Sequence, residues 1–128
     1  MANTVVIKKA VEVGAASVVR LGDQEEWRST CGMRRDFVPV GKDEPVWFHY
    51  MRISDSRKHV HKRTTEYYYV TEGVGEIELD DETVPIAKGD MIIVPANTPH
   101  QVIPKGGAPI VLMTMHVPFP PKDWPPTN

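Results

Sequence analysis

Short runs of β-branched and aromatic residues alternate with turn residues along residues 46–117. Such runs are typical of strands, and clusters of Gly, Pro, Asp, Asn and Ser separate nearly all of them. None keeps the periodicity of an amphipathic helix. The expected strands are 46–53, 60–61, 66–70, 74–79, 83–86, 91–94, 100–103 and 110–117. This pattern predicts an all-β sandwich or small barrel.

The N-terminal third of the chain is less regular. Its short β-branched runs predict edge strands, and an acidic segment that Asp23 can cap is long enough for only one turn. Gly32 interrupts the extended segment that follows. In chain order these are the runs 5–7, 11–13 and 17–21, the turn 23–27, the extended segment 28–38 and a loop at 39–45.

The C-terminal residues 118–128 contain five prolines, which cannot donate to a sheet ladder. We expect a tail that lies on the surface and is held by Trp124, or one that packs on a second subunit. At 128 residues the chain is long enough for one compact core and too short for two. The prediction is therefore a single domain over 1–128, with N-terminal strands and a loop in 1–45 and the barrel core in 46–117.

Charge and cysteine content exclude several classes of protein. The formal net charge is −2, which favours neither a nucleic-acid surface nor a polybasic membrane surface. No apolar run approaches the roughly 18–20 residues of a membrane span, and the N-terminus does not resemble a signal peptide. Cys31 is the single cysteine, so neither an internal disulfide nor a thiolate zinc site can form. We expect a cytoplasmic protein that binds neither nucleic acid nor membrane.

Candidate chemistry gathers in one stretch of the central region. His59 and His61 are separated by one residue, so on a strand both imidazoles point to the same face. A turn through residues 63–65 then brings Glu66 back beside them. Two imidazoles and a carboxylate are metal-ligand types, and they converge here on one point.

This spacing resembles the first signature of the cupin superfamily, which is His-x-His, four residues, Glu, six residues and Gly. The match runs from His59 to Gly73. The second cupin signature is similar to the segment in which Gly89, Pro95 and His100 keep the expected separations. The chain is thus identified as resembling a small single-domain cupin.

Three positions depart from the cupin pattern. Asn97 replaces a Gly, which changes little because Asn tolerates a left-handed turn conformation. Pro104 stands in place of an Asn that is not a metal ligand. Ile53 stands where the first signature begins with Gly, which indicates a differently shaped approach to the metal loop.

The resemblance implies a double-stranded β-helix, or jelly-roll, barrel with one divalent metal ion inside. The implied ligands are His59, His61, Glu66 and His100. This donor set suits Fe, Mn, Ni or Zn, and a six-coordinate ion would keep two positions open for chemistry. Ligation needs neutral imidazoles, so affinity should fall in acid, near their ordinary pKa of about 6.5. His49 matches no signature and is expected to be an ordinary hydrogen-bonded residue.

Strand alternation predicts further cavity residues. If Glu66 faces the metal, Tyr68 and Val70 also face inward, and Tyr67 and Tyr69 face away. Tyr68 is then the best-placed phenol for hydrogen bonding or proton transfer. The resemblance implies a base or a substrate contact at this position, and the alternative is a packing residue with a satisfied hydroxyl.

The last strand supplies a second catalytic candidate. By the same resemblance, Thr114 and His116 face the cavity. His116 could act as a general acid or base near neutral pH, and the alternative is a rim histidine without a role.

The register of residues 46–53 stays open, because two sets of large residues compete for the core face. The first set is Trp47, His49 and Met51, and the second is Phe48, Tyr50 and Arg52. Four arginines are candidates for a bidentate clamp on a substrate carboxylate, namely Arg34, Arg35, Arg52 and Arg57.

Three functions remain open from the sequence. A dioxygenase would bind substrate and dioxygen at the open metal positions, whereas an isomerase, lyase or decarboxylase would use the metal to polarise a carbonyl or carboxylate. A non-catalytic binding module would keep the metal as an anchor. The complete ligand set favours an enzyme that acts on a small organic acid, carbonyl or sugar-like molecule. The resemblance also implies a homodimer paired through an N-terminal edge strand, since exposed edge strands need cover.

Overall fold

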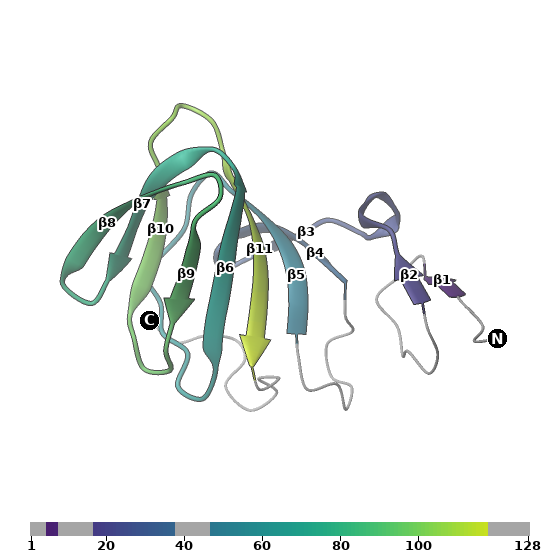
Figure 1. Cartoon of the computed structure of the whole chain (residues 1–128), viewed down its shortest axis with the longest axis horizontal. Coiled ribbons are helices and arrows are strands. Elements are labelled where there is room, and N and C mark those ends of the chain that lie inside the picture. Colours follow the sequence, from purple (N-terminus) through teal and green to yellow (C-terminus); the bar gives the residue numbers. More distant parts are fainter. Residues whose placement is uncertain (1–4, 8–16, 38–46, 118–128) are drawn as a thin grey trace.

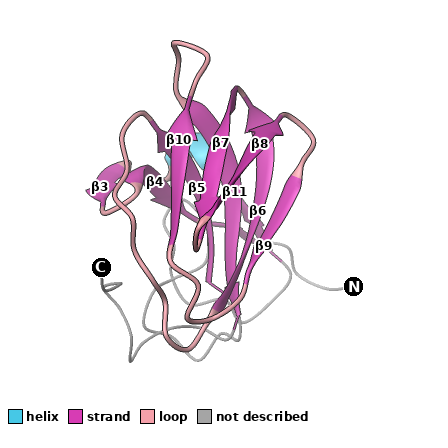
Figure 2. Cartoon of the chain, turned by 90° about the vertical axis from the view of Figure 1, so that its left-hand side faces the viewer, coloured by secondary structure: helices cyan, strands magenta, loops and turns pink. Residues whose placement is uncertain are grey.

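The computed structural model describes residues 5–7, 17–37 and 47–117, and strands dominate them (Figure 1). Two sheets face each other, and Figure 2 views the smaller sheet with the larger one behind it. In the order of pairing, the larger sheet comprises β3 (Trp27–Ser29), β4 (Gly32–Asp36), β5 (Trp47–Ile53), β11 (Ile110–Val117), β6 (Thr65–Glu72) and β9 (Met91–Val94). The smaller sheet comprises β10 (His100–Pro104), β7 (Val74–Leu79) and β8 (Glu82–Ala87).

These sheets form the predicted jelly-roll barrel, whose two sheets are not joined into a closed ring. The outer strands are β3 and β9 in the larger sheet and β10 and β8 in the smaller one, and none pairs with a strand of the other sheet. The bounds of β7, β9 and β11 match the strands expected from the sequence, and β6 is longer than expected at both ends. Turn residues limit the strands as predicted. Gly73 and Gly89 adopt positive φ, a conformation that glycine allows and that reverses the backbone at these turns.

The inner face of β6 confirms the predicted alternation. Glu66, Tyr68 and Val70 are buried, whereas Tyr69 is 44% exposed on the outer face. β6 pairs with β11 on one side and β9 on the other, so its inward residues are covered by both neighbours. One carboxylate and one phenol therefore enter the barrel interior beside each other.

Tertiary pairing settles the register of β5. Trp47, His49 and Met51 are buried, and the residues between them are only partly covered. The antiparallel pairing of β5 with β11 sets Trp47 opposite His116 and His49 opposite Thr114. His49 therefore shares the inner face with the candidate catalytic residues, although no signature includes it.

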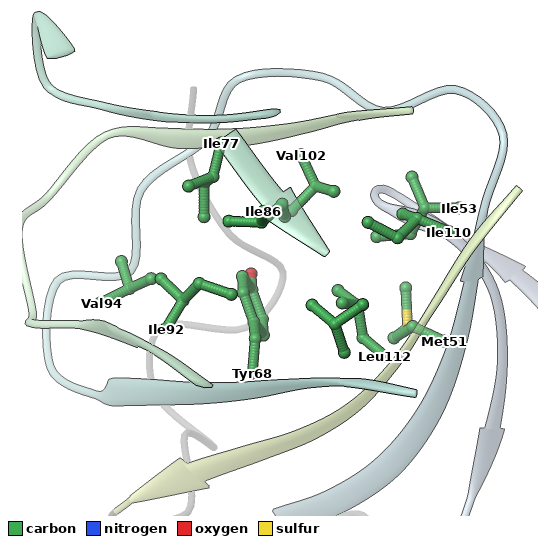
Figure 3. Packing of buried hydrophobic residues seen from close by; sticks show 11 residues of the cluster. Met51, Ile53, Tyr68, Ile77, Ile86, Ile92, Val94, Val102, Ile110 and Leu112 are labelled. Atoms are coloured by element: carbon green, nitrogen blue, oxygen red, sulfur yellow. The ribbon is translucent and has the colours of Figure 1, made fainter. Parts of the chain in front are cut away.

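The apolar core fills one part of the space between the sheets, and both sheets contribute to it (Figure 3). Burying each of these aliphatic side chains stabilises the fold by roughly 1.5–3 kcal/mol. Tyr68 belongs to this cluster and also borders the histidines, since its ring centroid lies 6.1 Å from that of His100. The other members are Met51, Ile53, Val70, Ile77, Ile86, Ile92, Val94, Val102, Ile110 and Leu112.

The N-terminal strands differ in part from the prediction. β1 (Val5–Ile7) and β2 (Ser17–Val19) pair in parallel as a separate two-stranded sheet and are not edge strands of the barrel. The expected turn at 23–27 is a 3-10 turn, η1 (Leu21–Asp23), because the backbone N–H of Gln24 already bonds to the Leu21 carbonyl. β3 then begins at Trp27.

Several predicted segments lie outside the described residues: the run 11–13, the loop 39–45 and the tail 118–128 with Trp124. Within the described ranges, no helix has the length and apolar character needed to cross a membrane.

Candidate metal centre

Backbone hydrogen bonds bring the two histidine segments together. His59 and His100 form an isolated antiparallel bridge, in which each N–H donates to the other residue's carbonyl at 3.0 and 2.9 Å. The N–H of Asn97 donates to the His61 carbonyl at 2.7 Å, and Asn97 holds φ +66°, as expected for the residue that replaces Gly. The two segments are thus fixed side by side although they are distant in the sequence.

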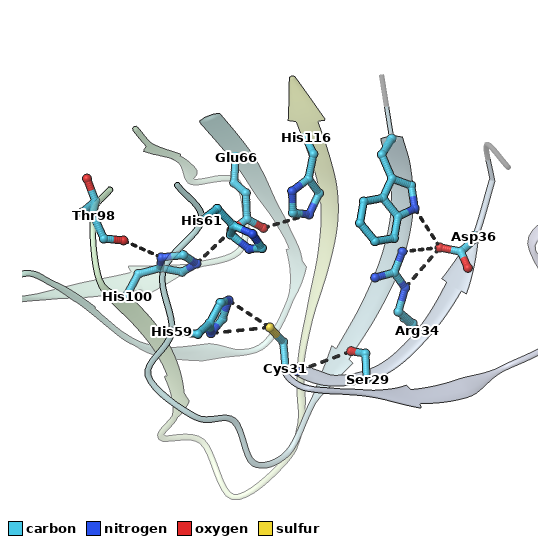
Figure 4. A network of polar contacts seen from close by, with 11 residues as sticks. Ser29, Cys31, Arg34, Asp36, His59, His61, Glu66, Thr98, His100 and His116 are labelled. Carbon is cyan, nitrogen blue, oxygen red and sulfur yellow. Dashed lines mark hydrogen bonds and ion pairs between the residues drawn. The ribbon is translucent and has the colours of Figure 1, made fainter. Parts of the chain in front are cut away.

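All four predicted ligands meet inside the barrel (Figure 4). The possible ligand atoms of His59, His61, Glu66 and His100 lie within 4.8 Å of one another, and all four residues are buried. Glu66 is at the centre, with its Oε1 2.8 Å from Nε2 of His100 and 3.0 Å from Nε2 of His61. This compact, water-shielded donor set has the composition of a divalent-metal site.

Hydrogen bonds to the outer ring nitrogens determine which nitrogens can bind a metal. Nδ1 of His59 lies 2.8 Å from the Arg57 carbonyl, and Nδ1 of His100 lies 2.8 Å from the Thr98 carbonyl. A carbonyl only accepts, so each Nδ1 carries a proton, and in the neutral form of each ring the Nε2 lone pair points inward. Hydrogen bonds from the outer ring nitrogen to a carbonyl orient histidines toward a metal.

The inward lone pairs fit a cation. Nε2 of His100 lies 2.8 Å from a carboxylate oxygen of Glu66, so positive charge is needed at this point, either as a proton shared in a hydrogen bond or as a metal ion bound by both atoms. Both atoms are buried, and neither has another hydrogen-bond partner within the described chain. A divalent ion supplies that charge, so the residues present suit a metal.

Electrostatics around Glu66 favour its charged form. Burial opposes the charge, but His116, His100 and His61 outweigh it and hold the pKa of Glu66 well below its ordinary value. Burial also lowers the pKa of His100, yet the hydrogen bond to Glu66 and its charge raise that pKa overall. Burial, reinforced by His100, lowers the pKa of His59 to about 4. Glu66 is therefore anionic and His59 neutral near pH 7.

His116 lies beside the four ligands and contacts Glu66. Its Nε2 is 3.1 Å from Oε2 of Glu66, the carboxylate oxygen that faces away from His61 and His100. Burial lowers the pKa of His116 to about 4, although Glu66 acts in the opposite direction. The neutral ring donates a hydrogen bond from Nε2–H to Glu66, and its Nδ1 therefore carries a lone pair. That Nδ1 is buried and has no partner among the described residues.

Tyr68 is on the same inner face, two residues beyond Glu66. Its side chain is 4% exposed. Burial, the charge of Glu66 and a hydrogen bond with that carboxylate raise the pKa of Tyr68 well above its ordinary value. Tyr68 therefore keeps its proton, which suits a hydrogen-bond donor or general acid better than the base implied by resemblance.

A narrow cavity opens onto His61, Glu66, Tyr68 and His116. It contains about 310 Å³ between protein atoms, with the space at its opening included. A cavity of this size suits a small ligand. The polar residues along its walls include Cys31, Arg34, His49, Glu66, Tyr68 and His116.

Of the four arginine candidates, Arg34 lines this cavity. Its guanidinium lies 4.1 Å from the ring centroid of Trp47 and 4.7 Å from that of Trp27, and it pairs with Asp36. Both indole N–H groups also donate to Asp36. Asp36 thus neutralises the charge of Arg34 inside the barrel wall.

The other three arginines point elsewhere. Arg35 and Arg52 form ion pairs with Glu26. Arg57 is exposed, and its backbone carbonyl orients His59. None of the three lines the cavity described above.

Cys31 is a cavity residue that sequence reasoning missed. Its Sγ lies 3.2 Å from Nε2 of His59, and burial together with Glu66 raises the pKa of the thiol. A lone cysteine carries no spacing signal, and Cys31 reaches the site only because the β3–β4 hairpin pairs with β5.

Comparison with known proteins agrees with this geometry. The family model described as "Cupin domain" matches residues 47–116, which include every candidate ligand. The chain belongs to the cupin family. A curated relative is an uncharacterized protein of Methanocaldococcus jannaschii, which is 37% identical over 60 residues, or 47% of this cupin and 48% of the relative. The cupin thus spans about half the length of the curated relative that it matches.

Solved structures with the same fold are more distant in sequence. A protein from Planctomyces limnophilus has a TM-score of 0.70 at 22% identity, covering 79% of this cupin and 87% of that chain. A predicted oxalate decarboxylase from Thermotoga maritima has a TM-score of 0.67 at 19% identity, covering 79% and 98%. Pac13 of Streptomyces, a nucleoside dehydratase, has a TM-score of 0.63 at 20% identity, covering 78% and 89%. These likenesses establish the jelly-roll fold.

Proposed function

We propose that this cupin is a divalent-metal-dependent enzyme that catalyses a redox-neutral proton-transfer reaction, a lyase or isomerase step, on a small polar molecule. The observation that carries this proposal is the position of two proton-transfer groups beside the donor cluster. Tyr68 and His116 line the same cavity as Glu66, and Nε2 of His116 lies 3.1 Å from Oε2 of Glu66. Burial keeps both groups neutral, so Tyr68 has a proton to donate and His116 has a lone pair to accept one.

In this proposal His59, His61, Glu66 and His100 hold one ion of Fe, Mn, Ni or Zn. When bound, the metal would polarise a carbonyl, carboxylate or hydroxyl oxygen of the substrate. Glu66 supplies the anionic ligand, and its second oxygen accepts a hydrogen bond from Nε2–H of His116. The carboxylate thereby fixes the tautomer of the proposed base.

The proton-transfer roles follow from protonation states at neutral pH. His116 would accept a proton at Nδ1, and its Nε2–H bond to Glu66 would stabilise the resulting imidazolium. Tyr68 would donate its phenolic proton to a leaving or developing oxygen. A positioned acid or base of this kind contributes typically 10²–10⁴-fold to rate.

Two solved structures of the same fold have names that suit a lyase reaction. Among structures of the same fold, one is a nucleoside dehydratase and one a predicted oxalate decarboxylase. Both names describe the removal of a small group from a substrate.

The test begins with elemental analysis of protein purified without added metal. A screen of small acids, carbonyl compounds and sugars follows, under aerobic and anaerobic conditions. We expect near-stoichiometric metal and turnover that is equal without oxygen. Tyr68→Phe and His116→Gln should keep the metal but lose at least 10²-fold in kcat. Oxygen consumption that matches turnover would instead identify a dioxygenase, and ligand binding without turnover a binding module.

We also propose a homodimer in the cytoplasm. The outer face of β6 and β9 carries Tyr69, Met91 and Ile93 at 44%, 60% and 55% exposure. Such a contiguous apolar patch is typical of a contact surface. Sedimentation at micromolar concentration should give twice the chain mass, and a monomer would contradict this part of the proposal.

A further inference from the structure

Polar atoms without partners extend beyond the metal ligands along the inner face. Nδ1 of His49 and Oγ1 of Thr114 are buried and have no hydrogen-bond partner among the described residues. The two side chains are 2% and 1% exposed. They are direct cross-strand neighbours, and Thr114 also pairs with Tyr68. His49, Thr114 and Tyr68 therefore form one polar row across β5, β11 and β6.

This row lies next to the proposed catalytic groups. His49 stacks on His116 with ring centroids 5.3 Å apart, and both rings pack on Trp47. His116 and Glu66 form the preceding inward row, about 7 Å away by strand geometry. His49 and Thr114 line the same cavity as Glu66. A ligand on the metal can thus reach the polar row with its far end.

Buried donors and acceptors without partners are rare, because each costs free energy comparable to a lost hydrogen bond. Two such atoms on adjacent strands, facing one cavity, are therefore typical of a surface made for a ligand's polar group. A packing role would be served equally well by Val at position 114, which has the same shape without the hydroxyl.

The charges decide which polar group fits. Arg34 is the cation nearest this wall, and Asp36 already neutralises it inside the protein. Burial and Arg34 hold the pKa of His49 well below its ordinary value, so the ring is neutral. Glu66 adds a negative charge one row away. A second carboxylate would find no free positive charge here, whereas a hydroxyl can both donate to and accept from neutral partners.

We propose that His49 and Thr114 form a subsite for a neutral hydroxyl group at the far end of a metal-bound substrate. This inference rests on the proposed function and narrows its substrate class to small hydroxylated compounds. The metal-side group can be a carboxylate or carbonyl. The distal group is an alcohol.

Three four-carbon acids that differ only at the far end test the subsite: butyrate, 4-hydroxybutyrate and succinate. Their affinities are measured by titration calorimetry on the protein as purified, with its metal content recorded. We expect 4-hydroxybutyrate to bind about 3–10-fold more tightly than butyrate, the range of one neutral hydrogen bond. Succinate should bind more weakly than 4-hydroxybutyrate.

Thr114→Val is the decisive variant. It should abolish the preference for 4-hydroxybutyrate over butyrate and leave the Tm unchanged or higher, because it removes a buried hydroxyl without a partner. Thr114→Ser keeps the hydroxyl and should keep the preference. Thr71→Val is the matched control, since Oγ1 of Thr71 donates to the Val111 carbonyl at 3.3 Å on the other face. It should lower the Tm and leave the preference intact.

Two results would overturn the subsite: equal binding of butyrate and 4-hydroxybutyrate by the native protein, or tightest binding of succinate. A preference that survives in Thr114→Val would do the same. Failure of the proposed function is recognised separately, by absent metal or absent turnover. A protein that holds metal and prefers 4-hydroxybutyrate but turns over no substrate would contradict the enzyme and support the subsite, whereas a protein without metal that binds none of the three acids would overturn both.

Discussion

Acid should destabilise the metal-free protein over a defined pH range. Burial holds the pKa of His59 and of His116 at about 4 in the folded state, against an ordinary value of 6.5. Because the unfolded chain binds these protons first, folding stability is fully present above pH 6.5 and is lost as the pH falls toward 4. The pKa of His49 is lowered too and acts in the same direction.

The size of this loss follows from the difference in histidine pKa between the folded and unfolded states. A fall from 6.5 to about 4 corresponds to roughly 3 kcal/mol for each of His59 and His116. His100 opposes this trend, because its raised pKa favours the protonated folded state. A domain of this size has about 5–15 kcal/mol of total stability. We therefore expect a net loss of several kcal/mol between pH 7 and pH 4.5.

Urea denaturation of chelator-treated protein at pH 7, 6, 5 and 4.5 measures this loss. With a slope of about 1–3 kcal/mol per molar urea, the midpoint should fall by more than 1 M across the range. His116→Gln removes one of the two groups. Between pH 7 and pH 4.5 this variant should therefore lose roughly 2–3 kcal/mol less of its free energy of unfolding than the native protein loses.

A midpoint that stays constant from pH 7 to pH 4.5 would refute the reasoning, because it would mean that the buried imidazoles are not held neutral by their surroundings. The same conclusion would follow if His116→Gln kept the full pH dependence of the native protein. Bound metal should steepen the dependence, since protons then compete with the ion for the same nitrogens.

Three further substitutions test the geometry. His100→Ala should lower metal affinity at least 10–100-fold, measured as metal retained after dialysis, and retention equal to the native protein would exclude His100 as a ligand. Asn97→Ala should cost about 1 kcal/mol in urea denaturation because its φ is +66°, whereas Asn97→Gly should cost nothing. Gly75→Ala would drive its Cβ into the Ile103 carbonyl oxygen and should cost more than 2 kcal/mol. Gly22→Ala, with no atom within 4 Å, is the control that should remain near native stability.

Local patterns carried much of the fold and of the metal site. The period of two along β6 placed Glu66 and Tyr68 on one face because successive side chains on a strand alternate. The same rule predicted that His59 and His61 face one side, and both reach the site, although in place of the expected strand at 60–61 the structure has only an isolated bridge between His59 and His100. Resemblance to the cupin signatures then joined His100 to this group, and the structure brings its Nε2 to 2.8 Å from Glu66.

Long-range pairing decided what local patterns left open. The face of β5 that turns inward depends on its alignment with β11, so His49 entered the cavity only in the folded barrel. Cys31 and Arg34 reach the site because the β3–β4 hairpin adds to the edge of β5.

By itself, the sequence determined where the strands lie and which residues share a strand face, because these depend on neighbours two to ten positions away. Only the tertiary structure decided which faces meet. That choice depends on hydrogen bonds and packing between strands separated by tens of residues, and it created the environment that charges Glu66 and keeps His116 neutral.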